Sequence, residues 1–460
     1  MSGTVTEAKG IRLKPYPKYT QSNVPWLGAV PDHWEIDRMK WTVTACQNGV
    51  WGDDPDKDKG VLCVRVADFD RVRFRVDLDD PTMRAIPMHQ LPSRLLNNGN
   101  LLLEKSGGGE QQPVGAVVLW TSDEPAVCSN FIGKMPVSDG YSPDYLCYLH
   151  AALYSGRVNT RSIKQNTGIQ NLDSASYLNE RVSLPPLHEQ QTIVAFLDRE
   201  TAKIDAMISK KERLIELLEE KRTAIISHAV TKGLDPNAPM KDSGIDWLGK
   251  IPAHWDVKPV NRVLREYMAG PFGSSLTKDT YGGAVFRVYG QEQVIPGDFR
   301  RGDYYIPEVK FREMKRFAVR PGDVLLSCVG TFGRVAIVPN DAEPGIINPR
   351  LIKLSPCLGL LQPEYLELFL GSELAYAQMD ELSRGGTMDV INLSMVARLT
   401  MPLPPKDEQD QIVEYTGHET TQLDSIVDKN RAVIDKLREY RSALISAAVT
   451  GKIDVREEPV

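Results

Sequence analysis

The sequence has few features of a secreted, metal-binding or membrane protein. Its six cysteines, at positions 46, 63, 128, 147, 328 and 357, include no Cys-x-x-Cys pair, which argues against a structural zinc site and a disulfide framework in a chain of 460 residues. The sequence lacks a long apolar run, so it predicts no membrane-spanning helix, and its N-terminus does not resemble a signal peptide. Positive charge is not in excess either, because the formal net charge is −6. We therefore expect a cytoplasmic protein in which any nucleic-acid binding uses local basic surfaces.

Motifs for catalysis are incomplete. Gly244-Ile-Asp-Trp-Leu-Gly249-Lys250 resembles a phosphate-binding loop, but Ile251 stands where a Ser or Thr hydroxyl would bind the metal ion. Asn348-Pro-Arg-Leu351 lacks the second proline and the aromatic residue of a methyltransferase motif. The histidines show no metal-ligand spacing, and we expect His33 and His254 to be structural. The sequence predicts no catalytic site, no cofactor and no metal ion.

An internal repeat of about 220 residues is the most informative feature. Trp26-Leu-Gly-Ala-Val-Pro-Asp-His-Trp34 recurs 221 residues later as Trp247-Leu-Gly-Lys-Ile-Pro-Ala-His-Trp255. Leu184-Pro-Pro-Leu-His-Glu-Gln190 and Val230-Thr-Lys-Gly-Leu-Asp235 recur 219 residues later, at 403–409 and 449–454. Three anchors in one order indicate a duplicated module rather than a short-period solenoid. Between the anchors the copies diverge, as we expect of one scaffold adapted to two targets.

Each copy begins with a segment that we interpret as a mixed α/β domain. Short runs of Val, Ile and Leu, broken by Gly, Pro and Asp, are typical of strands and turns, and they occur at 60–66, 101–103, 114–120, 324–327 and 335–338. Residues 145–153 and 363–376 have helical spacing. In our alignment of the copies, Val64-Arg65-Val66 corresponds to Phe286-Arg287-Val288, and Asn130 corresponds to Asn348.

Each copy ends in a predicted long helix that follows a Pro-Pro pair. In the second copy, residues advancing in alternating steps of three and four form a heptad seam: Leu423, Ile426, Asn430, Val433, Leu437, Tyr440 and Leu444. The matching positions of the first copy are Ile204, Met207, Lys211, Leu214, Leu218, Lys221 and Ile225. In one interpretation each helix packs on its own domain. We favour the other, in which the helices pair with each other in antiparallel sense, because a duplication naturally gives a pseudo-two-fold axis.

The twin Trp-Leu-Gly-x-x-Pro-x-His-Trp and Leu-Pro-Pro-x-x-Glu-Gln segments make the chain similar to type I restriction-modification specificity subunits over nearly its whole length. Further matching segments are Gly270-Pro-Phe-Gly-Ser274, Arg320-Pro-Gly-Asp-Val-Leu-Leu-Ser327 and Gly330-Thr-Phe-Gly333. The first copy departs from this pattern, with Gln47-Asn-Gly-Val-Trp-Gly52 in place of the Gly-Pro-Phe-Gly segment and a longer loop, Ser106-Gly-Gly-Gly-Glu-Gln-Gln112.

The resemblance implies two mixed α+β target-recognition domains, each reading one half of a split DNA site, separated by two long antiparallel coiled-coil helices. On this basis we divide the chain into an N-terminal tail (1–25), a first recognition domain (26–183), a first spacer helix (184–232), a linker (233–246), a second recognition domain (247–402), a second spacer helix (403–450) and a C-terminal tail (451–460). The implied partners are double-stranded DNA, two DNA methyltransferase subunits and ATP-dependent restriction subunits, with no membrane. The chain itself would be non-catalytic.

Basic and amide-rich stretches are the candidate DNA contacts, since Arg and Lys position phosphates or read guanine, and Asn and Gln read adenine. We expect the alternation of Arg71, Arg73 and Arg75 to place all three on one strand face. The other candidates of the first copy are Lys105, Ser106, Gly107, Arg157, Arg161, Lys164, Gln165, Asn166 and Asn171. Those of the second copy are Phe272, Gly273, Ser274, Ser275, Lys310, Arg312, Lys315, Arg316, Arg384 and Thr387.

Two alternatives to this interpretation stay open from sequence. Any single basic stretch could be an ordinary solvated surface, and the glycine run 107–109 could be a flexible hairpin tip rather than a loop that approaches the DNA backbone. The whole chain could also be an adaptor that binds two protein partners through its repeated domains without reading DNA.

Overall fold

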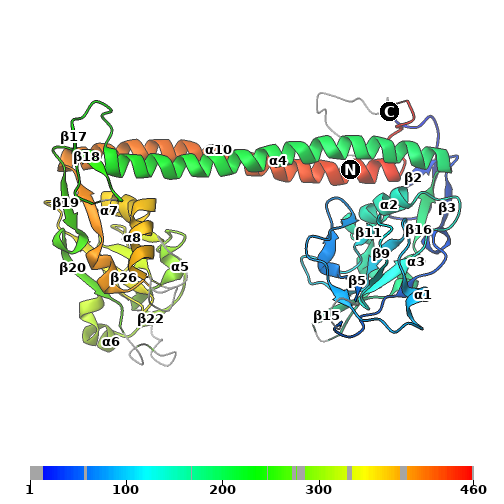
Figure 1. Cartoon of the computed structure of the whole chain (residues 1–460), viewed down its shortest axis with the longest axis horizontal. Coiled ribbons are helices and arrows are strands. Elements are labelled where there is room, and N and C mark those ends of the chain that lie inside the picture. The colour runs from blue at the N-terminus through cyan, green and yellow to red at the C-terminus, as the bar shows by residue number, and fades with distance from the viewer. Residues whose placement is uncertain are drawn as a thin grey trace. The chain divides into compact units, whose positions relative to one another are not determined.

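The computed structural model describes residues 14–55, 60–166, 168–245, 247–271, 276, 285–328, 334–383 and 391–457. The chain forms two compact units (Figure 1). Unit 1 comprises residues up to Lys211 together with those from Ala432 onward, and unit 2 comprises Glu212–Arg431. Each unit contains one mixed α/β domain and a part of each of two long helices, α4 (Leu187–Lys232) and α10 (Lys406–Val449). The predicted fold class is confirmed.

The domain of unit 1 is built on a six-stranded sheet in the order β4-β13-β9-β11-β7-β6. Its strands are Gln47–Asn48, Ile132–Met135, Leu101–Glu104, Val117–Leu119, Arg75–Val76 and Phe69–Asp70. A three-stranded sheet, β12-β5-β8, consists of Ala126–Cys128, Val61–Val64 and Met83–Arg84, and another, β10-β15-β14, of Ser106–Gly107, Ile169–Leu172 and Ile163–Asn166. Two pairs complete the strands: β1 (Tyr19–Gln21) with β2 (Ala29–Pro31), and β3 (Glu35–Arg38) with β16 (Arg181–Leu184). The α-helices are α1 (Leu91–Arg94), α2 (Pro143–Ser155) and α3 (Ser174–Leu178).

The domain of unit 2 repeats this plan, with fewer strands among its described residues. A four-stranded sheet, β20-β26-β23-β24, contains Leu264–Ala269, Leu351–Pro356, Val324–Ser327 and Val335–Ile337. A three-stranded sheet, β22-β21-β25, contains Tyr305–Ile306, Phe286–Tyr289 and Gly345–Ile347. The strand pairs are β17 (Met240–Asp242) with β18 (Lys250–Pro252), and β19 (Asp256–Pro259) with β27 (Thr400–Leu403). The α-helices are α5 (Gln291–Val294), α6 (Glu308–Glu313), α7 (Pro363–Leu370), α8 (Glu373–Ser383) and α9 (Leu393–Arg398).

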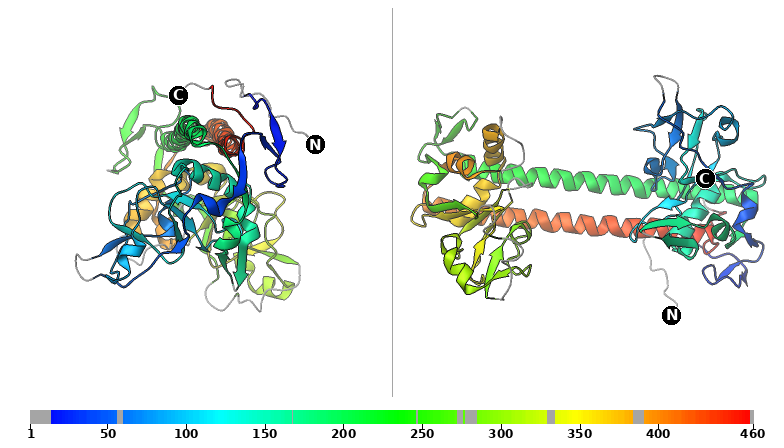
Figure 2. Two further views of the ribbon diagram at one scale, coloured as in Figure 1. Left: turned by 90° about the vertical axis from the view of Figure 1, so that its right-hand side faces the viewer. Right: turned by 90° about the horizontal axis from the view of Figure 1, so that it is seen from below.

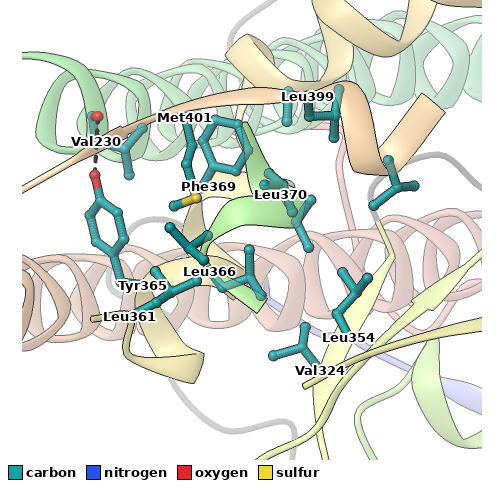
Figure 3. Packing of buried hydrophobic residues seen from close by; sticks show 14 of the residues in the cluster. Val230, Val324, Leu354, Leu361, Tyr365, Leu366, Phe369, Leu370, Leu399 and Met401 are labelled. Atoms are coloured by element: carbon teal, nitrogen blue, oxygen red, sulfur yellow. Dashed lines mark hydrogen bonds between the residues drawn. The ribbon is translucent and has the colours of Figure 1, made fainter. Parts of the chain in front are cut away.

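Helix α7 anchors the core of unit 2 (Figure 3). Its residues Tyr365, Leu366 and Phe369 are fully buried, and burial of each such side chain contributes about 1.5–3 kcal/mol. The Tyr365 hydroxyl donates to the carbonyls of Val230 (3.4 Å) and Pro402 (3.1 Å), so the helix is tied to the C-terminal end of α4. Tyr145 on α2 makes the equivalent bonds in unit 1, to the carbonyls of Val449 (3.2 Å) and Ser183 (3.4 Å).

The strand ladders revise one part of the sequence alignment. In unit 1 the parallel ladder pairs Cys128 with Val64, and in unit 2 it pairs Ile347 with Tyr289. Strand Val61–Val64 therefore matches Phe286–Tyr289, so the predicted match of Val64-Arg65-Val66 with Phe286-Arg287-Val288 was wrong by three residues. Both segments are short runs of apolar residues around an arginine, and sequence alone does not distinguish these registers.

The two long helices lie side by side in each unit (Figures 1 and 2). In unit 2, Arg431 of α10 pairs with Glu219 of α4 (3.2 Å), and Arg222 of α4 pairs with Asp424 of α10 (3.5 Å), which fixes an antiparallel sense. In unit 1, Arg441 of α10 pairs with Asp205 of α4 at 2.9 Å. The expectation that the helices pair with each other is confirmed within each unit.

The buried seam of these helices differs from the predicted one at alternate positions. Leu423, Asn430, Leu437 and Leu444 are buried or half-buried as expected, but Ile426, Val433 and Tyr440 are exposed. The next residues, Val427, Ile434 and Arg441, are buried instead. The same one-residue shift occurs on α4, where Ile208 and Ile215 replace the predicted Met207 and Leu214. The seam still alternates steps of three and four, but in the opposite phase.

Among the described residues, the helices are either too short or too polar to cross a lipid bilayer.

Candidate nucleic-acid interface

The repeated sequence anchors form the scaffold of each domain by contacting one another. At the start of α4, the buried Glu189 carboxylate accepts hydrogen bonds from the indole of Trp34 (3.1 Å) and the hydroxyl of Tyr16 (2.5 Å), and it lies 2.9 Å from the imidazole of His33. The Glu of the Pro-Pro-x-x-Glu-Gln segment is thus the partner of the His-Trp pair. The structural role expected for this histidine agrees with its position.

Unit 2 repeats this joint at the start of α10. Glu408 accepts from the indole of Trp255 at 3.0 Å and lies 2.7 Å from the imidazole of His254. The glutamines that follow act alike: Gln190 accepts from the amide of Ser142, and Gln409 accepts from the amide of Gln362, both at 2.9 Å. Because each motif contacts the others of its unit, the repeat marks the attachment of the domains to the helices rather than a binding site.

The two ends of the described chain meet in unit 1 (Figure 2). The Asp454 amide donates to the Lys14 carbonyl at 2.8 Å, and the Lys452 ammonium donates to the Leu27 carbonyl at 2.6 Å. Gly451 has φ +69° and lies against Pro31, where a Cβ atom would be 2.3 Å from the proline ring. In unit 2, the chain leaving α4 at Lys232 runs directly into the corresponding segment. One joint is therefore covalent and the other is held by hydrogen bonds.

The small sheet β10-β15-β14 brings together half of the candidate residues of the first copy. On the central strand β15, Asn171 is paired with Ser106 of β10 on one side and with Lys164 of β14 on the other. Gln170 is paired in the same way with Gly107 and Gln165. The Ser106 hydroxyl bonds to the Asn171 side chain, and Lys164 pairs with Asp173 at 2.7 Å. Asn166 ends β14. In Figure 1, β15 lies at the end of the domain remote from α4.

Lys105 connects this sheet to the loop Gln47–Gly52, whose residues were not among the candidate contacts predicted from sequence. Its ammonium donates to the Asn48 side chain at 2.5 Å, and Arg94 donates to the Asn48 carbonyl. Three residues further on, Trp51 is exposed, and the Arg84 guanidinium lies 4.5 Å from its ring centroid. We call the surface formed by the following residues the β15 face: Asn48, Trp51, Arg84, Arg94, Lys105, Ser106, Lys164, Gln165 and Asn171.

Trp51 is the counterpart of Phe272. The Gly49 amide donates to the Ile132 carbonyl, as the Gly270 amide does to the Leu351 carbonyl, both at 2.9 Å. A Cβ atom on either glycine would lie 1.9 Å from a carbonyl oxygen, that of Cys128 or of Asn348, so both positions require glycine. Gly49-Val-Trp-Gly52 thus replaces Gly270-Pro-Phe-Gly273 at the 221-residue offset of the Trp-containing anchor. The sequence analysis matched these two segments but included only Phe272 among the candidate contacts, although the same offset places Trp51 at the equivalent position.

The three alternating arginines do not share a strand face, so that expectation was wrong. Strand β6 ends at Asp70 and strand β7 begins at Arg75, and the residues between them form a turn. The Asp70 carboxylate closes this turn by accepting from the amides of Val72 and Arg73. Only Arg73 projects into solvent, with 80% of its side chain exposed.

Arg71 and Arg75 serve instead as partners of acidic side chains. Arg71 donates to the buried Glu104 carboxylate at 2.9 Å, and Arg75 donates to Asp144 at 2.6 Å. Burial raises the pKa of Glu104, and the Arg71 hydrogen bond acts in the opposite direction. Arg157 and Arg161, near the one-turn helix before β14, are exposed; Arg161 lies 4.0 Å from Glu180.

Part of the candidate set of the second copy lies outside the described residues: Phe272, Gly273, Ser274, Ser275, Arg384 and Thr387. On α6, Lys310 pairs with Glu313 (3.0 Å) and Arg312 pairs with Glu308 (2.5 Å). Lys315 and Arg316 are exposed, and the Arg316 guanidinium lies over the ring of Phe317.

A largely apolar hollow of about 550 Å³ lies in unit 2 at the place that corresponds to the β15 face. Cys328 lines it and occupies the position of Lys105. The Lys105 amide donates to the Phe131 carbonyl, and its carbonyl accepts from the Leu172 amide. In the same way, the Cys328 amide donates to the Arg350 carbonyl, and its carbonyl accepts from the Ile391 amide. The remaining lining includes Met268, Phe317, Ile391 and Arg316. The two domains therefore present different chemistry at one position of a shared scaffold: a lysine in unit 1 and an apolar hollow in unit 2.

No group of three His, Cys, Asp or Glu side chains in the described part of the chain is arranged to hold a metal ion. His150 illustrates the structural use of histidine here. It is fully buried, its Nδ1 lies 2.7 Å from the Tyr177 hydroxyl, and burial lowers its pKa to about 3.

Comparison with known proteins supplies the family. A sequence profile described as "Type I restriction modification DNA specificity domain" matches residues 93–217 and 294–424, more than half of the chain. The specificity subunit of the type I restriction enzyme EcoBI of Escherichia coli is 24% identical over 347 residues, covering 73% of this chain and 71% of the relative. The putative MjaX specificity subunit of Methanocaldococcus jannaschii is 21% identical over 445 residues, covering 94% and 96%.

Solved structures share the fold. A chain from a study of complex assembly and conformational transition of the type I R-M system matches with a TM-score of 0.68 at 17% identity, covering 92% of this chain and 99% of that one. The HsdS subunit from Thermoanaerobacter tengcongensis matches with a TM-score of 0.50 at 19% identity, covering 92% and 98%. With the profile match over both copies, these findings show that the chain belongs to the family of type I restriction-modification DNA specificity subunits.

Proposed function

We propose that this chain recognises a bipartite DNA site and directs methyltransferase and restriction subunits to it, without catalysing a reaction itself. The observation that carries the proposal is the difference between equivalent positions of the two domains. Lys105 of the β15 face corresponds to Cys328 in the apolar hollow of unit 2. One scaffold with two different surfaces suits the reading of two different half-sites, with residues 26–183 and 247–402 as the reading domains.

The β15 face provides both kinds of group that DNA recognition requires. Lys105, Lys164 and Arg94 supply positive charge for phosphates, and Gln165 and Asn171 supply the paired donor and acceptor that an adenine edge accepts. Trp51 offers an exposed aromatic ring that is already stacked with an arginine. These roles extend to the second copy through Phe272 and Arg316, which belong to the corresponding segments.

Two equivalent apolar positions on the helices support two methyltransferase partners. Met207 and Val433 are exposed in unit 1, and their counterparts at the 219-residue offset, Ile426 and Leu214, are exposed in unit 2. Exposed apolar side chains that recur at equivalent positions of both copies suit two identical protein partners. We propose that each unit binds one methyltransferase subunit through these residues, and that ATP-dependent restriction subunits join this assembly for cleavage.

The proposal is tested by combining the purified chain with its methyltransferase subunits and sequencing the methylated bases on genomic DNA. We expect one split motif, with DNA binding that weakens as salt rises because phosphate contacts release counterions. The chain alone should show no turnover of S-adenosylmethionine. A salt-independent association with protein partners, without any DNA motif, would favour the adaptor interpretation instead.

A further inference from the structure

Arg441 on α10 joins three separate segments of unit 1. Its guanidinium donates to both carboxylate oxygens of Asp205 on α4, at 2.9 and 3.3 Å. The same group donates to the Val72 carbonyl at 2.7 Å and lies 5.2 Å from the ring centroid of Phe74. Only 10% of the side chain is exposed. One arginine therefore ties the turn between β6 and β7 to both long helices.

The turn is held in place from the domain side as well. Phe74 has φ +57°, a left-handed conformation that a bulky residue adopts only when its surroundings enforce it. Its carbonyl accepts from the Leu119 amide at 3.0 Å, and its ring meets that of Tyr148 edge-on at 5.8 Å. The Tyr148 hydroxyl in turn donates to Asp198 on α4 at 2.6 Å. Burial raises the pKa of Tyr148, and the bond to Asp198 raises it further, which keeps this donor protonated.

Unit 2 retains the ion pair but has other residues at the positions of Tyr148 and Asp198. At the 219-residue offset, Arg222 corresponds to Arg441 and Asp424 to Asp205, and the two lie 3.5 Å apart with 45% and 59% of their side chains exposed. Leu368 occupies the position of Tyr148, and Gly417 occupies that of Asp198, so the second hydrogen bond has no counterpart. The duplication therefore supplies an internal control in which the ion pair is more exposed and the Tyr148–Asp198 hydrogen bond has no counterpart.

We propose that Arg441 and Tyr148 are positioning residues that fix the orientation of the first domain on the long helices, and that the second domain lacks this restraint. The inference rests on the proposed reading of a bipartite site, because a fixed orientation matters for the distance between two half-sites. An exposed ion pair such as Arg222–Asp424 does little by itself to fix the orientation of a domain. The additional contacts of Arg441 with the Val72 carbonyl and the Phe74 ring fix the orientation, because both groups are held in place within the domain.

The first test measures hydrogen exchange on the full chain and needs no DNA. In Arg441→Ala, we expect the amides of residues 69–77 to exchange at least tenfold faster than in the unmodified chain, while strand β9 keeps its protection. Tyr148→Phe, a milder change, should give a smaller increase at the same residues. Arg222→Ala is the matched control and should leave exchange in the domain of unit 2 unchanged. Unchanged exchange at 69–77 in Arg441→Ala would overturn the proposal.

The second test separates positioning from mere stability. Each variant, assembled with methyltransferase subunits, is offered a library of DNAs in which the half-sites are constant and the spacer between them varies. Arg441→Ala should accept a wider range of spacer lengths at unchanged half-sites, whereas Arg222→Ala should keep the original range, and Arg441→Lys should fall between. Faster exchange with an unchanged spacer range would reduce Arg441 to a structural role and overturn the inference. If the unmodified chain selects no bipartite site, the proposed function fails, and the exchange result still decides whether the restraint exists.

Discussion

Trp51 shows how much of the recognition surface depends on single residues. Its ring is exposed beside the Arg84 guanidinium, and in the sequence it is matched by Phe272 of the second copy. The Gly49 backbone fixes where this aromatic residue projects, because a side chain at that position would collide with the Cys128 carbonyl. The scaffold glycine is shared between the copies, and the aromatic residue that follows it differs.

We predict that Trp51→Ala weakens binding to the half-site read by the first domain. Loss of an aromatic contact with DNA is expected to cost about 1–3 kcal/mol, which corresponds to a roughly 5- to 150-fold loss of affinity. The measurement is a titration of DNAs in which one half-site at a time is scrambled. Trp41→Ala serves as a control, since Trp41 is also exposed but lies outside the β15 face. An equal loss at both half-sites would contradict the prediction.

Glu367 on α7 carries a separate consequence for pH. Burial, together with the smaller effect of the Glu364 charge, raises its pKa to about 7. A carboxyl whose folded pKa is raised prefers its neutral form in the fold, so the stability it contributes is present below its unfolded pKa of 4.5 and is lost as pH rises through about 7. The position is occupied by Cys147 in the first copy, at the offset that relates Tyr145 to Tyr365.

We therefore predict that Glu367→Gln stabilises unit 2 at pH 8.5, by about 2 kcal/mol, and has a much smaller effect at pH 5. Thermal unfolding at the two pH values checks this, with an expected rise in Tm of about 4–8 °C at the higher pH. Glu220→Gln, on the exposed surface of α4, is the control and should leave Tm unchanged at both. A rise that is the same at both pH values would mean that packing, not charge, is responsible.

At the scale of elements, sequence patterns predicted the long helices and their pairing but not the phase of their seam. Apolar residues are adjacent at Ile426-Val427 and at Val433-Ile434, so the two heptad phases differ in hydrophobicity mainly at Tyr440 and Arg441. The buried phase is the one that contains Arg441, a residue that a hydrophobicity pattern places on the surface. Similarly, alternation of charge at residues 71–75 suggested a strand, although the Asp70 side chain closes a turn there. In both places a polar contact decided the structure.

The paired helices lead to a prediction about spacer length. Duplicating residues 212–218 in α4 and 425–431 in α10 adds one heptad to each helix and preserves the seam. Each helix then lengthens by about 10 Å at 1.5 Å per residue. At about 3.4 Å per base pair, the methylated motif should gain roughly three unread base pairs with unchanged half-sites. Sequencing methylated bases before and after the change measures this.

The control for this experiment lengthens α10 alone. An unmatched heptad displaces Arg431 from Glu219 and buries the wrong residues, so we expect loss of assembly rather than a longer spacer. A doubly lengthened, active variant with an unchanged spacer would show that the helices do not set the distance.

At the scale of the whole molecule, the duplication predicted two similar domains, and the structure explains why the anchors recur. Glu189 and Glu408 need their His-Trp partners, whereas the β15 face and its counterpart are free to differ. Sequence alone located Lys105, Ser106, Lys164 and Asn171 but did not show that one small sheet gathers them. That gathering depends on pairing between segments about 60 residues apart, for which the intervening sequence offers no local signal.

The modular plan predicts that exchanging residues 40–180 for the same region of a related subunit changes one half-site only. The exchanged region contains the β15 face but leaves Glu189 and its partners His33 and Trp34 in place, so the joint with the helix survives. The methylated motif of the hybrid is the measurement. A simultaneous change of both half-sites would mean that the two domains do not read DNA independently.

The hydrogen-bonded joint between Asp454 and Lys14 also bears on how such a gene can be arranged. That joint stands where the corresponding segment after α4 is continuous chain. The chain could therefore be closed at the first joint and opened at the second without loss of either contact. Joining the ends by a short linker and opening the chain between Pro236 and Pro239 would place the second domain first in the reading frame. We expect such a rearranged gene to encode a protein that specifies the same DNA motif, so that gene order in this architecture is free to change by recombination without a change in what is read.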